Sequence, residues 1–196
     1  MPPKLTAWSA DWQRLHPKWD LQLWRESGEG KIATKGFEIV SNHPAQLAAA
    51  CHLSQRSNIW RYELINRFGG VYLDTDVEPI RPIDDLLAGV EAFASLMIAH
   101  RDKKTQICLG CSVFGATLNH PWPSSLSSRL DTMDATIHGS LGSHYFSDVT
   151  DTHPEVTRFP PGVFSASNKI SGGYAIHHWS SRWWPNSFKP LNETKT

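Results

Sequence analysis

The sequence predicts an α/β fold with a mostly parallel central sheet, and three observations support this. Segments with helical spacing alternate with short apolar segments, as they do when helices and strands follow one another along a chain. A length of 196 residues without an evident internal repeat suits one domain with a substantial core. Two aspartates directly follow a short apolar segment, and ligands of parallel α/β sheets bind beyond the carboxyl ends of strands.

The first half of the chain is expected to lead into one long helix. Residues 7–15 predict a short helix, and strands are expected near residues 20–24 and 38–40. Residues 45–68 contain neither proline nor glycine, so we expect a single helix there. A strand over residues 71–73 follows.

The second half continues the alternation. Strands are expected over residues 93–98 and 111–115. Prolines at the start of residues 120–137 and an apolar stripe further on predict a helix. Residues 174–179 are expected to form a buried strand that ends the alternating pattern.

Asp74 and Asp76 are candidate metal ligands. In an extended segment, residues two apart point to the same face, so these carboxylates would aim together while Thr75 points away. Like charges this close resist joint ionisation unless a positive charge lies between them. A hard divalent cation, Mg²⁺ or Mn²⁺, prefers such oxygen ligands. The structural alternative is an exposed acidic turn.

Arg61 is expected to point into the molecule. At about 100 degrees per residue, the apolar face of the 45–68 helix continues backwards into polar side chains, namely Arg61, Asn58 and Ser57. A buried guanidinium needs an anion or several acceptors. Two interpretations stay open and are compatible: an internal salt bridge to Asp74 or Asp76, and contact of Arg61 and Asn58 with a polar, anionic ligand beside the metal.

The composition restricts the classes of partner. Nineteen basic and nineteen acidic residues give a formal net charge of zero, so the sequence carries no electrostatic footprint for nucleic acid. Nine tryptophans suit stacking against sugar or nucleotide rings, although several near the N-terminus can equally be core residues. Cys51, Cys108 and Cys111 form an odd set, so buried thiols are favoured over disulfides or a zinc site.

Neither a signal peptide nor an apolar segment long enough for a transmembrane helix is recognisable in the sequence. We therefore expect a cytoplasmic protein, or one that is peripheral to a membrane.

Two neighbouring motifs resemble a glycosyltransferase family. Residues 57–64 read Ser-Asn-Ile-Trp-Arg-Tyr-Glu-Leu, and residues 69–76 read Gly-Gly-Val-Tyr-Leu-Asp-Thr-Asp. Together they resemble the DXD-containing sugar-binding region shared by yeast initiating α-1,6-mannosyltransferases, inositol phosphoceramide mannosyltransferases and the catalytic domains of clostridial glucosylating toxins. Weaker similarity extends over residues 16–24, 114–121 and 175–179.

The resemblance implies a GT-A-like, Rossmann-like sandwich that binds a nucleotide sugar. Residues 1–196 are expected to form a single domain without the family's first strand, which helps to hold the nucleotide base. The implied activity is metal-dependent transfer of a hexosyl group, with mannosyl as one candidate, from a UDP- or GDP-sugar to a glycan, lipid or protein acceptor with retention of configuration. Asn58 stands where the family usually has Asp.

The resemblance also implies roles for particular residues. Asp74, Asp76 and Arg61 would be catalytic, and Asp76, Asp74 and His177 would bind Mn²⁺ or Mg²⁺. The expected substrate-binding residues are Ser57, Asn58, Arg61, Tyr72 and Asp74. Because neighbouring strand residues face opposite sides, only one of His177 and His178 can reach the metal, and we choose His177.

Two other functions remain open at this point. Residues 72–77 fit the Asp-x-Asp signature of haloacid-dehalogenase-like phosphatases, but some seventy residues precede a motif that normally opens that domain. The third candidate is a non-catalytic sugar-nucleotide-binding protein, which the missing strand and Asn58 would suit.

Overall fold

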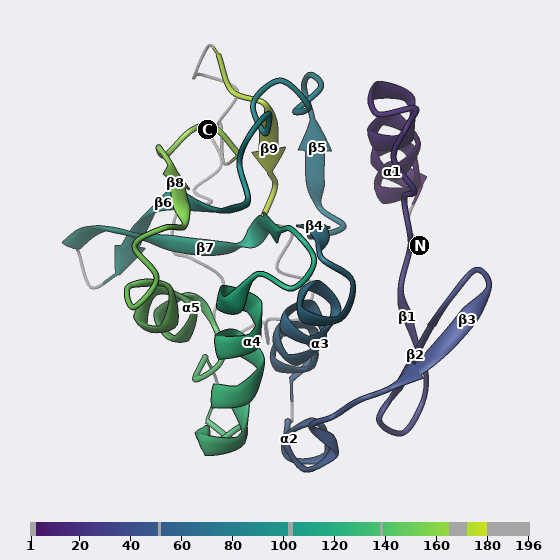
Figure 1. Ribbon diagram of the computed structural model, residues 1–196, viewed down its shortest axis with the longest axis vertical. Helices are drawn as coiled ribbons and strands as arrows, with labels where there is room; N and C mark the ends of the chain where they lie inside the picture. Colours follow the sequence, from purple (N-terminus) through teal and green to yellow (C-terminus); the bar gives the residue numbers. More distant parts are fainter. Residues whose placement is uncertain (1–2, 51, 102–103, 138, 165–171, 180–196) are drawn as a thin grey trace, which may run out of the picture.

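A four-stranded sheet lies at the centre of the computed structural model, which describes residues 3–50, 52–101, 104–137, 139–164 and 172–179 (Figure 1). The strand order is β4-β7-β6-β8, with the following bounds: β4 Gly70–Leu73, β6 Ala92–Arg101, β7 Lys104–Ala116 and β8 Thr157–Phe159. Both pairings of β7 are antiparallel, and β6 with β8 is the sheet's parallel pair. The expectation of a mostly parallel sheet is therefore wrong.

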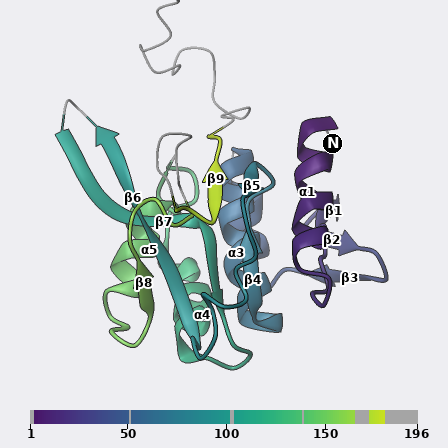
Figure 2. The same ribbon diagram turned by 90° about the horizontal axis from the view of Figure 1, so that it is seen from above.

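The connection between β6 and β7 explains this difference. Arg101 pairs with Lys104, so the two longest strands follow each other as a hairpin, which Figure 2 shows projecting beyond the rest of the sheet. Parallel neighbours need a crossover of a dozen or more residues, and the chain offers no such length here. Alternating helices and strands along the sequence did not reveal this direct return.

Three helices enclose the main core with the sheet. They are α3 Leu53–Phe68, α4 Pro121–Ser128 and α5 Ser143–Thr150, and both α3 and α5 contact β7. Ile59, Tyr62, Phe114, Leu126 and Phe146 are all fully buried in this core. The helices therefore hold β7 and the end of β4 in a fixed position.

A second core lies on the other side of β7 and anchors the first helix. Helix α1, Pro3–Leu15, packs on β5, Val77–Pro79, which pairs antiparallel with β9, Ala175–His177. The indole of Trp12 is buried and donates a hydrogen bond to the Val77 carbonyl at 2.9 Å. This second core positions β5 and β9 immediately beyond the end of β4.

The remaining elements are peripheral. A small antiparallel sheet has three strands, β1 Arg25–Gly28, β2 Lys31–Thr34 and β3 Phe37–Val40. Helix α2, Pro44–Ala49, follows this sheet in the chain, and the 3₁₀ helix η1, Arg129–Thr132, follows α4. In Figure 1, α1 and this small sheet lie on the right-hand side of the molecule. No helix in the described part of the chain combines the length and apolarity needed to cross a membrane.

Several predicted elements are confirmed. The expected helix over residues 7–15 is α1, and the expected strands over 38–40, 71–73, 93–98, 111–115 and 174–179 are β3, β4, β6, β7 and β9. Cys108 and Cys111 are half-buried free thiols, whereas Cys51 lies outside the described residues.

Other element boundaries differ from the prediction. Residues 20–24 alternate apolar and polar but pair with no strand among the described residues, because a local pattern does not supply a neighbour. The expected long helix is two helices, since Ala50 and His52 adopt extended backbone angles between α2 and α3. This bend buries Leu47, whose carbonyl accepts a hydrogen bond from Arg56 at 2.6 Å.

The expected helix over residues 120–137 also ends early. It ends with η1 at Thr132, where Met133 becomes extended and Asp134 accepts hydrogen bonds from the backbone and hydroxyl of Thr136. Aspartate readily forms such a local turn instead of continuing a helix. The sequence prediction missed five short elements altogether: β1, β2, β5, β8 and α5.

Candidate functional site

Two side chains from the turn between β4 and β5 meet one from the end of β9. Asp74 directly follows β4, Asp76 precedes β5, and His177 is the last residue of β9. The antiparallel register places Val77 opposite His177, and the His178 amide donates to the Asp76 carbonyl at 3.1 Å. The β5–β9 pair therefore brings a histidine from the C-terminal region to the aspartates.

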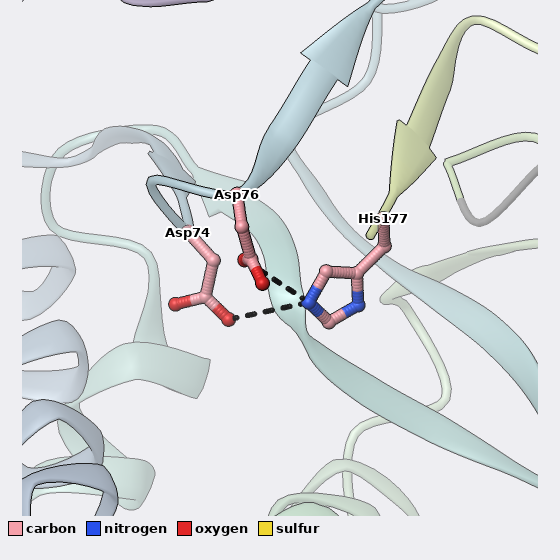
Figure 3. Close-up of side chains that lie close together, drawn as sticks. All are labelled: Asp74, Asp76 and His177. Atoms are coloured by element: carbon pink, nitrogen blue, oxygen red, sulfur yellow. Dashed lines mark ion pairs between the residues drawn. The ribbon is translucent and has the colours of Figure 1, made fainter. Parts of the chain in front are cut away.

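These side chains are close enough to share one cation. His177 Nε2 lies 3.3 Å from Asp76 Oδ1 and 4.0 Å from Asp74 Oδ2 (Figure 3). One ligand atom from each of the three residues can be chosen so that all lie within 4.8 Å of one another. Two carboxylate oxygens and an imidazole nitrogen form a donor set that suits a divalent metal ion.

One ring nitrogen of His177 has no hydrogen-bond partner among the described residues. The side chain is only 7% exposed, and this nitrogen, Nδ1, is buried. If a cation were bound between Nε2 and the carboxylates, a neutral imidazole would coordinate it through Nε2 and carry its proton on Nδ1. The donor atoms thus fit a divalent cation, with Nε2 as the nitrogen ligand.

His178 points away from this cluster. Its Nε2 lies 2.6 Å from Glu78 Oε2, and its ring stacks on Trp8 with centroids 4.3 Å apart. The strand alternation that the sequence implied is therefore present, and the structure brings His177 rather than His178 to Asp74 and Asp76.

Arg61 reaches the site from α3 and is buried. Its Nη2 lies 3.1 Å from Asp74 Oδ1 and 2.9 Å from Ser57 Oγ, and its side chain is 6% exposed. Nη1 donates to the Cys111 carbonyl, and the guanidinium lies over the Tyr72 ring at 4.7 Å. Of the two interpretations left open by the sequence, the internal salt bridge is present.

Arg61 keeps its charge in this position. Burial, the largest single influence, lowers its pKa, but the negative charge of Asp74 and further contributions from Tyr72, Cys111 and Tyr62 raise it by more. The net pKa therefore lies above its ordinary value. A permanently charged guanidinium holds one side of Asp74.

Tyr72 holds the same carboxylate oxygen. Its hydroxyl donates to Asp74 Oδ1 at 2.8 Å and lies 3.3 Å from Ser57 Oγ. Burial raises the pKa of Tyr72, and the negative charge of Asp74 adds to this shift, so the phenol stays protonated. Because Oδ1 accepts from Arg61 and Tyr72, Oδ2 is the oxygen that faces His177.

The cluster opens into a pocket of about 390 Å³ between α3, the middle of β7 and the start of α5. All the predicted site residues line this pocket except Tyr72, which contacts the pocket residue Asp74 through its hydroxyl. Asn58 is 7% exposed, and its Oδ1 lies 3.8 Å from the Cys111 thiol. The sequence prediction missed the opposite lining residues, which are Gly110, Cys111, Gly139, Gly142 and Ser143.

Only a weak signal for these residues exists in the sequence. Gly139 and Gly142 flank Ser140 and Leu141, a spacing that suits a tight loop before a helix. Nothing local connects that loop to Asn58, which approaches it only in the tertiary structure.

Comparison with protein families identifies the region that carries most of this site. Residues 2–94 match the family described as the glycosyltransferase sugar-binding region containing a DXD motif, over a little under half of the chain. The match includes α3 and both aspartates but not His177 or the loop before α5. It confirms the resemblance to a DXD-containing glycosyltransferase sugar-binding region. None of the curated proteins compared with the chain matches it.

Proposed function

We propose that this chain is a metal-dependent glycosyltransferase that moves a hexosyl group from a nucleoside diphosphate sugar to a glycan, lipid or protein acceptor. The observation that carries the proposal is the meeting of Asp74, Asp76 and His177 in one pocket, within a chain whose residues 2–94 match a glycosyltransferase sugar-binding region. A GT-A-like nucleotide-binding arrangement, Mn²⁺ or Mg²⁺ as the cofactor, and a UDP- or GDP-sugar as the donor are parts of the same proposal.

Asp74 Oδ2, Asp76 and His177 Nε2 would hold the cation. When bound, it would stabilise the negative charge that develops on the leaving diphosphate. Arg61 and Tyr72 hold the other oxygen of Asp74, so the carboxylate cannot rotate away without losing two hydrogen-bonding contacts. Such prior positioning lowers the cost of ordering the site when the donor binds.

The polar lining of α3 would contact the donor. Ser57, Asn58 and Arg61 lie one turn apart or less on the helix face that lines the pocket. Arg61 is held by Asp74 and Ser57, so we assign it mainly to positioning Asp74 and to the positive potential of the pocket. Asn58 offers an amide to the sugar or phosphate without adding a negative charge.

The carboxylates of the pocket favour a one-step route to retention of configuration. Among the described lining residues, Asp74 and Asp76 are the only carboxylates, and both are assigned to the cation. A separate carboxylate nucleophile for a two-step reaction is therefore lacking among these residues. We propose front-face transfer, in which the acceptor oxygen bonds to the sugar C1 as the C1–O bond to the diphosphate breaks, and the acceptor proton passes to the leaving phosphate.

The two other functions considered from the sequence are less well supported. In a haloacid-dehalogenase-like phosphatase, Asp74 would have to attack phosphorus, but its Oδ1 is engaged by Arg61 and Tyr72. A non-catalytic sugar-nucleotide-binding protein would bind donors without turning them over, so a turnover assay separates it from a transferase.

A panel of UDP- and GDP-sugars, with and without Mn²⁺, tests the proposal by thermal shift. A ligand that binds only the folded state raises the melting temperature, so one donor should give a Mn²⁺-dependent increase. Asp76→Ala should abolish that increase, whereas Asp85→Asn, at an exposed position, should keep it. The panel is followed by an assay of Mn²⁺-dependent hydrolysis of the stabilising donor. No shift with any donor would refute the transferase assignment.

A further inference from the structure

The start of α5 forms one wall of the pocket. Neither the sequence motifs nor the family match assigns a role to this wall. Gly139, Gly142 and Ser143 line the same pocket as Asp74, Asp76 and His177, and they lie outside the matched residues 2–94. The wall thus faces the space in which a donor bound to the cation would lie.

The first backbone amides of α5 are unpaired. Gly142 is the N-cap residue and has no side chain to cap the helix. The Phe146 amide makes the first intrahelical bond, to the Gly142 carbonyl at 3.0 Å. Across the described part of the chain, the amides of Ser143, His144 and Tyr145 have no hydrogen-bond partner. Three donors at the positive end of the helix therefore lack a partner, and Ser143 is the one of these three residues that lines the pocket.

A second, independent donor points to the same place. Asn58 is 7% exposed, and its Nδ2 has no hydrogen-bond partner within the described ranges. A Cβ atom added at Gly142 would lie 4.0 Å from this nitrogen and 3.3 Å from the Gly139 carbonyl. Glycine thus leaves the space between Asn58 and the helix open. This nitrogen is therefore an unused donor on a residue that lines the pocket, and a bound ligand could supply its acceptor.

The donors define the chemistry of the ligand. Backbone amides and an Asn Nδ2 can only donate hydrogen bonds, so the ligand must supply acceptors, and a phosphate supplies several oxygens at once. Helix N-termini commonly bind such groups. Among the lining residues that the structure describes, the charged ones are Arg61, Asp74 and Asp76, which leave one net negative charge. A divalent cation reverses that sign, so phosphate binding should depend on the metal.

We propose that the amides of Ser143, His144 and Tyr145, together with Asn58 Nδ2, bind a phosphate group of the donor while the cation is in place. This inference rests on the proposed function, because it places the diphosphate between the cation and α5. It adds that the asparagine at position 58, in place of the family's usual aspartate, keeps this wall free of a repelling negative charge.

Calorimetric titration of the whole chain with inorganic pyrophosphate tests the subsite, with and without Mn²⁺. Ser143→Pro removes one amide donor, and proline is tolerated at the first position of a helix. Ser143→Ala keeps the amide and removes only the hydroxyl, so the difference between these variants measures the backbone contribution. We expect Ser143→Pro to bind pyrophosphate about tenfold more weakly than Ser143→Ala, with Mn²⁺ affinity equal in both.

Asn58→Asp supplies a second test that leaves the α5 backbone intact. It replaces a donor by an acceptor with a negative charge, so pyrophosphate should bind at least about tenfold more weakly. Equal affinities for Ser143→Pro and Ser143→Ala would overturn the backbone assignment, and an unchanged affinity in Asn58→Asp would overturn the role of Nδ2. Binding of Mn²⁺ without pyrophosphate would overturn the subsite alone, whereas absence of Mn²⁺ binding would overturn the metal centre as well.

Discussion

Arg61 Nη2 lies 3.1 Å from Asp74 Oδ1, and this ion pair connects the middle of α3 to the residue that follows β4. The pair has one almost fully buried member, Arg61, and one partly exposed member, Asp74. It holds one oxygen of Asp74 and leaves the other facing His177. The same contact therefore stabilises the fold and orients a candidate metal ligand.

Replacing Arg61 should lower the free energy of unfolding. Breaking one side of a buried ion pair costs about 3–5 kcal/mol, and the partial exposure of Asp74 reduces this for Arg61→Met to about 2–4 kcal/mol. Urea unfolding measures this loss. Arg14→Met is the matched control, because the Arg14–Asp11 pair is exposed and should contribute less than about 1 kcal/mol. Equal losses in both variants would contradict the structural role of Arg61.

His177 and His178 form a natural pair of test and control. His177→Ala should lower the affinity for Mn²⁺ by about tenfold or more, because it removes a proposed ligand. His178→Ala should leave that affinity almost unchanged and instead weaken the packing of α1, since His178 stacks on Trp8. Isothermal titration with Mn²⁺ and thermal unfolding of both variants give the two measurements. A larger loss of Mn²⁺ affinity in His178→Ala would show that the assignment is reversed.

Alanine substitutions at the two glycines before the aspartates should lower the stability of the fold by different amounts. Gly69 has a φ of 64°, and an added Cβ would lie 2.6 Å from the backbone nitrogen of Leu118. Gly70 also has a positive φ, 86°, but its Cβ would meet nothing within 4 Å. Gly70→Ala should therefore cost only the backbone strain, about 1–2 kcal/mol, and Gly69→Ala should cost clearly more. Comparison of the two free energies of unfolding in urea decides this, and equal values would contradict the close approach to Leu118.

Tyr72 should make the stability of the fold decrease at high pH. Burial raises its pKa in the folded state above the ordinary value of about 10, so the folded state resists losing this proton. Its contribution is fully present below pH 10 and is lost as the pH rises toward the folded-state pKa. The free energy of unfolding should therefore fall above about pH 10, and it should fall less steeply in Tyr72→Phe. An unchanged slope in that variant would assign the effect to other buried tyrosines such as Tyr62 and Tyr145, whose pKa values burial also raises.

The sequence was most informative where the site depends on short-range geometry. Ser57, Asn58 and Arg61 share one helix face because an α-helix repeats every 3.6 residues, and all three line the pocket. Asp74 and Asp76 also lie close together, but they lie on a turn in which the Val77 amide donates to the Asp74 carbonyl at 3.1 Å, and the expected extended segment is wrong. The helical period was thus sufficient to predict the first relationship, whereas the spacing of the aspartates indicated their proximity but not the turn that produces it.

Element boundaries and strand direction were predicted less well. The alternating segment at residues 20–24 has no strand partner among the described residues, and the helix expected over residues 45–68 is divided into α2 and α3. Both outcomes depend on contacts with distant parts of the chain, such as the burial of Leu47. The antiparallel β6–β7 hairpin likewise follows from a short connection rather than from the pattern of either strand.

By itself, the sequence determined the two aspartates, the inward polar face of α3 and the glycines that let the chain pass from helix to strand. The tertiary structure alone decided that β9 returns beside β5 and brings His177 to the aspartates, and that the uncapped start of α5 lies near Asn58. Those contacts join residues far apart in the chain. Their stabilisation comes from non-directional burial of apolar surface in two cores, which no local pattern of residues encodes.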